Sequence, residues 1–165
     1  METAAVEHAA DHAFGRLSAC GPDAERYATA GEAMIRFPKA HPRSTTVARA
    51  REEFRDDHVH ALLVVEDGIL LAVVERGDLE GRPGSDPVLA AGAIEGRAIS
   101  PDAHLLTQRD YMQETGHRRL AVVDDDRQLL GLLCLKRSGA GFCSDAGVAA
   151  RAAEREEQVR RALTQ

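Results

Sequence analysis

The stretch His60-Ala-Leu-Leu-Val-Val-Glu-Asp-Gly-Ile-Leu-Leu-Ala-Val-Val-Glu75 recurs in pattern further along the chain, as Arg118-Arg-Leu-Ala-Val-Val-Asp-Asp-Asp-Arg-Gln-Leu-Leu-Gly-Leu-Leu-Cys134. Both copies read as a short apolar strand, an acidic turn and a second apolar strand. In the first copy Asp67-Gly68 separates two apolar runs, which is a strong signal for a hairpin. A pattern that repeats in this way indicates two similar units, which bury their uncovered apolar faces against each other. We therefore expect one domain with pseudo-twofold symmetry.

Helix-like spacing precedes each copy. It is found at Pro42, Val47 and Phe54, and again at Pro101, Leu105 and Met112. Ser44 or Thr45 can cap the first of these helices. The strands are almost entirely apolar rather than alternating, which is typical of sheets that are covered on both faces. The sequence predicts an α/β fold in which each repeat is a small β-α-β-β-α unit, with the sheets packed together and the helices outside.

The chain divides into four parts on this basis. We expect a partly helical N-terminal extension at 1–32, the first repeat with its linker at 33–86, the second repeat at 87–138, and a loop with a charged helix at 139–165. Gly, Pro, Ser and Asp residues concentrated at 81–87 mark the linker. The final helix has a thin apolar stripe, which favours a solvated helix packed lightly on its own domain. The alternative is a helix that binds a partner.

Composition narrows the class of protein. Hydrophobic residues make up 44% and charged residues 29% of the 165 residues, as in a globular domain. The net charge of −6 argues against a nucleic-acid partner, because phosphate binding needs an excess of Lys and Arg. The longest apolar runs have the length of strands, and the N-terminus lacks the pattern of a signal peptide. We therefore expect a cytoplasmic protein without membrane spans.

The repeated order and its residues resemble a tandem pair of CBS domains, the module often called a Bateman domain. The family stretch L-P-V-V-D-x-x-G-x-L-V-G-I-V-T-x-x-D-L is similar to Leu63–Leu79 and again to Leu120–Arg137, and its lead-in V-M-x-x-x-P-x-x-x-x-x-P to Met34–Pro42. The resemblance covers roughly residues 33–138. It implies a regulatory rather than a catalytic protein, with adenosine-containing ligands bound between the repeats in many members.

The family's ligand signature is a Gly, a Thr or Ser three residues later, and an Asp three residues after that. In the first copy Asp78 stands at the ribose-binding position, Glu75 at the hydroxyl position and Ala72 at the Gly. A carboxylate only accepts hydrogen bonds, so it can bind both ribose hydroxyls. Glu75 opposes a polyphosphate unless Arg76 or another cation neutralises it. The alternative role of Asp78 is that of a helix cap or turn acid.

The second copy departs further from this signature. Arg137 stands where the family has Asp, so it can hold a phosphate but cannot accept from a ribose. The resemblance also implies that Arg118 and Arg119 can meet phosphates at the face between the repeats; the alternative is a surface pair near 124–126. We expect the adenine of a ligand whose ribose is bound by Asp78 to lie between apolar residues such as Ile35 and Phe37.

The sequence gives little indication of a catalytic site or of a metal site. His58 and His60 lie on one face of an extended segment, a spacing that metal sites use, but two ligands are too few. Cys134 falls within an apolar strand and reads as a packed small hydrophobe, whereas the Gly-rich loop around Cys143 favours an exposed thiol. With no nucleophile beside a base, we expect no enzyme, no catalytic residue and no metal site.

The resulting hypothesis is a stand-alone regulatory module that senses a nucleotide. AMP, ADP, ATP and S-adenosylmethionine are the expected ligands, and binding would signal to a regulated partner that the sequence does not identify. The alternative is a ligandless structural adaptor that serves for dimerisation. In both cases we expect a homodimer, because CBS pairs typically meet through helices, and two matched helices are present: Val47, Ala50 and Phe54, with Leu105, Gln108 and Met112.

Overall fold

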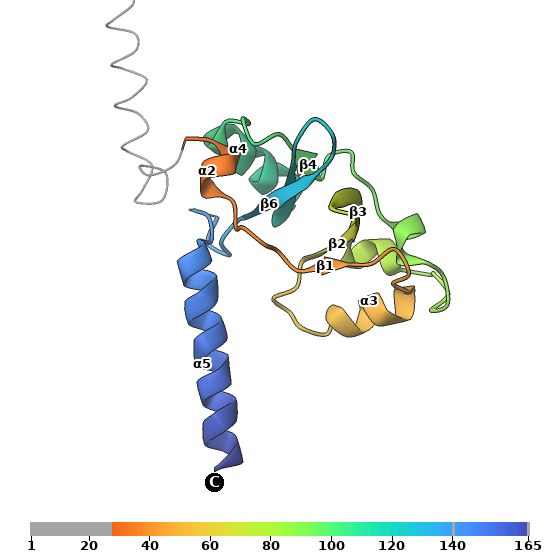
Figure 1. The fold of residues 1–165 in the computed structure, drawn as a ribbon, viewed down its shortest axis with the longest axis vertical. Coiled ribbons are helices and arrows are strands. Elements are labelled where there is room, and N and C mark those ends of the chain that lie inside the picture. The colour runs from red at the N-terminus through yellow and green to blue at the C-terminus, as the bar shows by residue number, and fades with distance from the viewer. Residues whose placement is uncertain (1–27, 140, 165) are drawn as a thin grey trace, which may run out of the picture.

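The computed structural model describes residues 28–139 and 141–164 of the chain. It contains two three-stranded sheets, in the orders β1-β2-β3 and β4-β5-β6, one from each repeat (Figure 1). The expected pseudo-twofold pair of small α/β units is therefore confirmed. The helix expected within the first 20 residues lies outside the described residues.

The first repeat comprises β1 (Ala40–His41), α3 (Val47–Glu53), β2 (Ala61–Glu66) and β3 (Ile69–Glu75), and ends in a 3₁₀ turn, η2 (Arg76–Leu79). Strand β1 runs parallel to β2, and β2 and β3 form the antiparallel hairpin. The closing helix of the expected β-α-β-β-α unit is thus reduced to a single 3₁₀ turn.

The second repeat has the same order: β4 (Ala98–Ile99), α4 (Leu105–Thr115), β5 (Arg119–Val123) and β6 (Leu129–Cys134). Its pairing is also the same, with β4 parallel to β5 and β5 antiparallel to β6. No helix follows β6 directly, because α5 (Asp145–Leu163) begins only after a loop.

Local sequence explains where these elements begin and turn. Helix α3 is capped by Thr46, whose hydroxyl accepts the backbone N–H of Arg49 at 3.2 Å. The expectation of a cap at Ser44 or Thr45 was wrong; the Thr45 hydroxyl instead donates to a backbone carbonyl. In the first hairpin Asp67 and Gly68 both have positive φ, 52° and 81°. This is the conformation that Asp-Gly favours in a two-residue turn.

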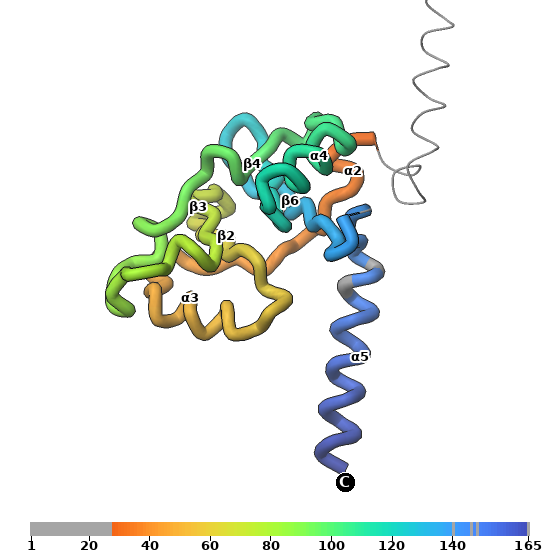
Figure 2. Tube along the Cα trace, turned by 180° about the vertical axis from the view of Figure 1, so that it is seen from behind, coloured from red at the N-terminus to blue at the C-terminus, as the bar shows by residue number. Residues whose placement is uncertain are grey.

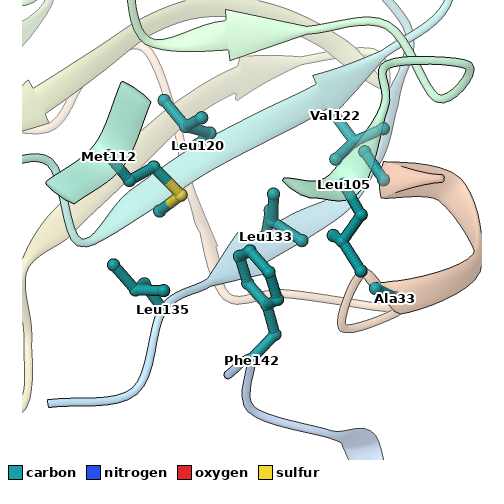
Figure 3. Close-up of a cluster of buried hydrophobic side chains, with 9 residues drawn as sticks. Ala33, Leu105, Met112, Leu120, Val122, Leu133, Leu135 and Phe142 are labelled. Atoms are coloured by element: carbon teal, nitrogen blue, oxygen red, sulfur yellow. The ribbon is translucent and has the colours of Figure 1, made fainter. Parts of the chain in front are cut away.

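Each sheet packs against helices on its outer side. The first repeat buries Val47, Ala50, Phe54, Leu62, Val64, Ala72, Val74, Leu79 and Val88 in one cluster. The second buries Ala30, Ala33, Leu105, Met112, Leu120, Val122, Leu133, Leu135 and Phe142, most of which Figure 3 shows converging between α4 and β6. Alternate residues of the same strands form a third cluster between the repeats, built on Leu63, Leu70, Val73 and Ala121. The sheets are covered on both faces, as the apolar strands predict.

The segment that precedes the first strand of each repeat, which we call its lead-in (residues 28–39 and 87–97), packs on the other repeat. Helix α2 (Ala30–Ala33) belongs to the core of the second repeat, and the 3₁₀ turn η3 (Val88–Ala91) packs on the core of the first. Each lead-in also forms one antiparallel bridge with a strand of the other repeat: Ile35 pairs with Leu132, and Ala93 pairs with Val73. The hairpin tips also bond to each other through the backbone, at 2.9 Å from Leu70 N–H to the carbonyl of Arg127. The two repeats are therefore interlocked.

Helix α5 stands apart from this body. It projects away from both sheets in Figures 1 and 2, and residues 149–164 are exposed throughout. Its N-terminus is held where the Asp145 carboxylate accepts the backbone N–H of Arg36 at 2.9 Å. The helix is solvated as expected, but it is attached at one end and does not pack along its own domain. Within 28–139 and 141–164, no helix combines the length and apolar character that crossing a membrane requires.

Candidate ligand site between the repeats

Asp78 lies at the junction of the repeats, in η2, and is already engaged. Both of its carboxylate oxygens accept from the guanidinium of Arg97, at 2.5 and 3.0 Å, and one also accepts the backbone N–H of Glu75 at 2.8 Å. The bond to Glu75 is that of a turn-capping acid, so the alternative role stated for Asp78 is present. The bidentate pair with Arg97 adds a link to the second repeat.

Arg97 is the central cation of this group. Its guanidinium also donates to the carbonyl of Val73 at 2.9 Å and lies 3.7 Å from the Glu75 carboxylate. Burial alone would raise the pKa of Asp78, but the hydrogen bonds from Arg97 and from the Glu75 backbone outweigh it and hold that pKa below its usual value. The hydrogen bonds to Asp78, together with the nearby Glu75 carboxylate, raise the pKa of Arg97. Both side chains are largely buried, with 15% of Arg97 and 20% of Asp78 exposed.

Glu75 is also contacted by the second repeat. Its carboxylate lies 2.5 Å from Nδ1 of His117, two residues before the start of β5. The ring of His117 faces Tyr111 of α4 at 5.9 Å between centroids, and the Tyr111 hydroxyl donates to the carbonyl of Gly96. Glu75, Asp78, Arg97 and His117 therefore form one group, the Asp78 cluster. It contains two acids from the first repeat and two bases from the second.

A hollow borders the Asp78 cluster. It has a volume of ≈ 330 Å³ and is lined by Gly96, Ala98, Ile99, Thr107, Gln108 and Tyr111, between β4 and α4. Gly96 adjoins Arg97 in the chain, and Tyr111 contacts His117, so the hollow and the cluster share a border. This volume is at the small end of the range of ligand sites, about 300–1,000 Å³.

Three other residues expected near Asp78 lie elsewhere. Arg76 does not neutralise Glu75; its guanidinium donates to the carbonyls of Phe54 and Val59 and stacks over the Phe54 ring at 5.2 Å. Ile35 exchanges backbone hydrogen bonds with Leu132 of the second repeat. Phe37 has 96% of its surface exposed and a positive φ of 56°. The exchange of lead-ins explains this result, because Ala93–Arg97 is the segment that reaches Asp78.

A second group lies around β5 and β6 and is cationic. Arg118 donates to the carbonyl of Leu135 at 3.1 and 3.2 Å, and Arg119 donates to the carbonyl of Arg118 at 2.9 Å. Burial and the guanidiniums of Arg119 and Arg118 lower the pKa of His60 to about 4, so its ring is neutral near pH 7. Burial likewise lowers the pKa of Arg119. The acceptors of these three hydrogen bonds are backbone carbonyls rather than carboxylates, so they do not cancel the positive charge of the two arginines.

The remaining predicted residues are placed as follows. Arg137 is exposed beyond the end of β6. Cys134 is buried in its strand, as expected, but Cys143 is also buried, with only 8% exposed. The expectation of an exposed Cys143 was wrong because Phe142, beside it, pairs with Leu135 and carries the loop back against β6.

Sequence reasoning missed Arg97 and His117. A signal for Arg97 was available, since a basic residue directly precedes the first strand of both repeats: Lys39 precedes β1 and Arg97 precedes β4. His117 carries no such mark. It follows Gly116, which ends α4 with a φ of 80°, and only the resulting turn brings its ring to Glu75.

Comparison with known proteins agrees with this architecture. The CBS domain family matches the chain at residues 30–81 and 87–137, which is more than half of its length. The chain belongs to the CBS domain family and carries a tandem CBS pair. No match was found among curated proteins.

Solved structures of CBS pairs are similar to this one. The CBS domains of a transcriptional regulator from Streptococcus pneumoniae have a TM-score of 0.56 at 14% identity, covering 68% of this chain and 95% of that one. CBSX2 in complex with AMP has a TM-score of 0.56 at 24% identity, covering 79% and 99%. The cytosolic domain of the Mg²⁺ channel MgtE in complex with ATP has a TM-score of 0.54 at 21% identity, covering 67% and 48%. At these identities the likeness shows the fold.

Proposed function

We propose that the chain is a regulatory CBS pair that binds an adenosine-containing ligand at the Asp78 cluster and signals the binding to a partner protein. The observation that carries the proposal is the position of Asp78, a largely buried carboxylate at the family's ribose position, with the Arg97 guanidinium of the second repeat bonded to it. The AMP and ATP complexes of similar CBS structures support the choice of ligand class.

The geometry suggests how the ligand and Arg97 share the site. Ribose hydroxyls would donate to the Asp78 carboxylate and replace the two bonds from Arg97. Arg97, once released, is a guanidinium next to the ligand, which suits a phosphate. Glu75 would remain in contact with His117. The hollow between β4 and α4 provides an adjoining apolar surface.

A second candidate is the ligandless adaptor. The observation that favours it is that both oxygens of Asp78 already accept hydrogen bonds without any ligand, from Arg97 and from the Glu75 backbone. In that case Arg97 permanently occupies the ribose position and the cluster serves to join the repeats. Dimerisation and a partner are common to both candidates, and so is the expected cytoplasmic location, which remains a prediction.

A thermal-shift screen with AMP, ADP, ATP, adenosine, S-adenosylmethionine and NAD separates the two candidates. A ligand at 100 times its dissociation constant stabilises the fold by about 2.7 kcal/mol. We expect at least one of these compounds to raise the melting temperature. Asp78→Ala is then expected to weaken that ligand by about 1.5–3 kcal/mol, roughly 10- to 150-fold.

The matched control is Arg137→Ala, which removes an exposed charge beyond β6 and leaves the Asp78 cluster intact. It is expected to bind as the unaltered protein does. If none of the six compounds shifts the melting temperature, the adaptor is the better description. If a compound binds equally well to Asp78→Ala, the ligand site is elsewhere.

A further inference from the structure

Cys134 and Cys143 lie opposite each other on two paired segments. Cys134 ends β6, and the chain returns beside it through the antiparallel bridge between Leu135 and Phe142. The backbone N–H of Cys143 donates to the carbonyl of Cys134 at 2.7 Å, and Lys136 donates to Gly141 at 2.8 Å on the other side of the bridge. This register places the two cysteines as a directly opposed pair with side chains on the same face of the ribbon.

Such a register suits a disulfide bond. Opposed residues at a hydrogen-bonded position have Cα atoms about 5.5 Å apart, within the range of about 4.4–6.8 Å that a disulfide spans. Both residues are free thiols in the structure, and the backbone hydrogen bond from Cys143 to Cys134 holds the two segments together at this position. Bond formation therefore needs little movement of the backbone.

The surroundings make the two thiols unequal. The hydrogen bond from the Cys134 thiol lowers the pKa of Cys143, and the guanidiniums of Arg151 and Arg119 act in the same direction. The pKa of Cys134 is raised by the same hydrogen bond and by burial. Arg119 stands opposite Cys134 on β5, and Arg151 lies in the second turn of α5. One thiol is thus favoured as a thiolate and its neighbour stays protonated.

We propose that Cys134 and Cys143 form a redox-active dithiol that a hydroperoxide converts to a disulfide. The Cys143 thiolate attacks the terminal oxygen of the hydroperoxide, the O–O bond breaks, and the product is a Cys143 sulfenic acid with hydroxide or an alkoxide as the leaving group. The Cys134 sulfur then attacks the Cys143 sulfur and forms the S–S bond, and water leaves with the Cys134 proton. For hydrogen peroxide, two thiols and one peroxide give one disulfide and two waters. A thiol reductant reverses the change.

The position of the bond indicates what it would control. Cys143 precedes Ser144, the residue that caps α5. A disulfide there joins the end of β6 to the root of α5 and fixes the direction in which this exposed helix leaves the body. The proposal concerns the redox state of the chain and does not depend on the adenosyl ligand.

Intact mass and disulfide mapping test the proposal on the full chain. Cys20→Ser leaves Cys134 and Cys143 as its two cysteines. After treatment of the folded Cys20→Ser protein with hydrogen peroxide, we expect a loss of two hydrogens, a peptide cross-link between Cys134 and Cys143, and recovery of both thiols with dithiothreitol. With Cys134→Ala added, Cys143 is expected to stop at the sulfenic acid and to react with dimedone.

The matched control is Cys143→Ala in the same Cys20→Ser background. Its remaining thiol, Cys134, keeps the burial that raises its pKa and so disfavours the reactive thiolate, and we expect no dimedone adduct. Circular dichroism establishes that each variant is folded. Two free thiols after peroxide treatment of the folded Cys20→Ser protein would overturn the proposal. So would separate oxidation of both cysteines to sulfinic acids without a cross-link.

Discussion

At the scale of single residues, the Asp78–Arg97 pair connects the two repeats at a place where neither charge is well exposed. Its two parallel bonds are of the kind that hold a guanidinium and a carboxylate in one geometry. Because 15% and 20% of these side chains are exposed, water screens their interaction only partly. Loss of one partner therefore leaves the other as an uncompensated, mostly desolvated charge.

Arg97→Met is expected to lower the free energy of unfolding by about 1–3 kcal/mol, because the Asp78 carboxylate loses its partner. Urea denaturation monitored by circular dichroism measures this change. The double variant Asp78→Asn/Arg97→Met is expected to be more stable than Arg97→Met alone, because it removes the isolated charge. Arg49→Met is the control, since the Arg49 side chain is exposed and its partners Glu52 and Glu53 lie on its own helix rather than on the other repeat. Equal effects at Arg97 and Arg49 would contradict this account.

At the scale of elements, sequence pattern predicted the strands, the hairpins and their order, because these depend on local spacing. Pattern did not predict which repeat each lead-in covers, since that depends on contacts between residues far apart in the chain. Two glycines show how closely each lead-in approaches the strand that it packs on. A Cβ on Gly131 would meet Met34 Sδ at 2.6 Å, and one on Gly92 would meet the Ala72 Cβ at 2.9 Å.

The missing glycine of the first repeat has a physical explanation on this basis. In the second repeat the strand supplies the small residue, Gly131, and the lead-in carries Met34. In the first repeat the strand carries Ala72 and the lead-in supplies Gly92. The strand and the lead-in therefore approach closely in both repeats, but the glycine that allows it lies in the strand in the second repeat and in the lead-in in the first. The family signature shows only that the glycine is missing from β3, and it does not show that Gly92 replaces it. For the same reason the sequence did not reveal that each lead-in packs on the other repeat, and Ile35 and Phe37 were wrongly expected beside Asp78.

Helix α5 supports a prediction at the same scale. Deleting residues 150–165 is expected to leave the melting temperature nearly unchanged, because every described residue of that segment is exposed. An isolated helix of this length is marginal in water, so the deleted segment contributes little to the stability of the core. Differential scanning fluorimetry of the full and shortened chains measures this. A drop of many degrees would mean that α5 packs on another copy of the chain.

At the scale of the whole molecule, we expect a homodimer. The residues proposed for the matched helices are mostly committed to the cores: Val47, Ala50, Phe54, Leu105 and Met112 are all buried within one chain. A second copy must therefore meet other faces of α3 and α4. A twofold assembly uses the same surface on both copies, so a modest apolar surface suffices. Multi-angle light scattering at tens of micromolar should give twice the chain mass, and a monomer would refute the expectation.

The exchange of lead-ins also bears on how such a chain could have arisen. If the first repeat were cut off within the linker at 81–87, it would keep α2, which it cannot use, and lose η3, which its own core needs. The second repeat would be left with the converse deficit. A one-repeat ancestor built in this way would have exposed an apolar face as a monomer. Pairing with another copy, each lending its lead-in to the other, would have covered that face before duplication and fusion joined the two genes.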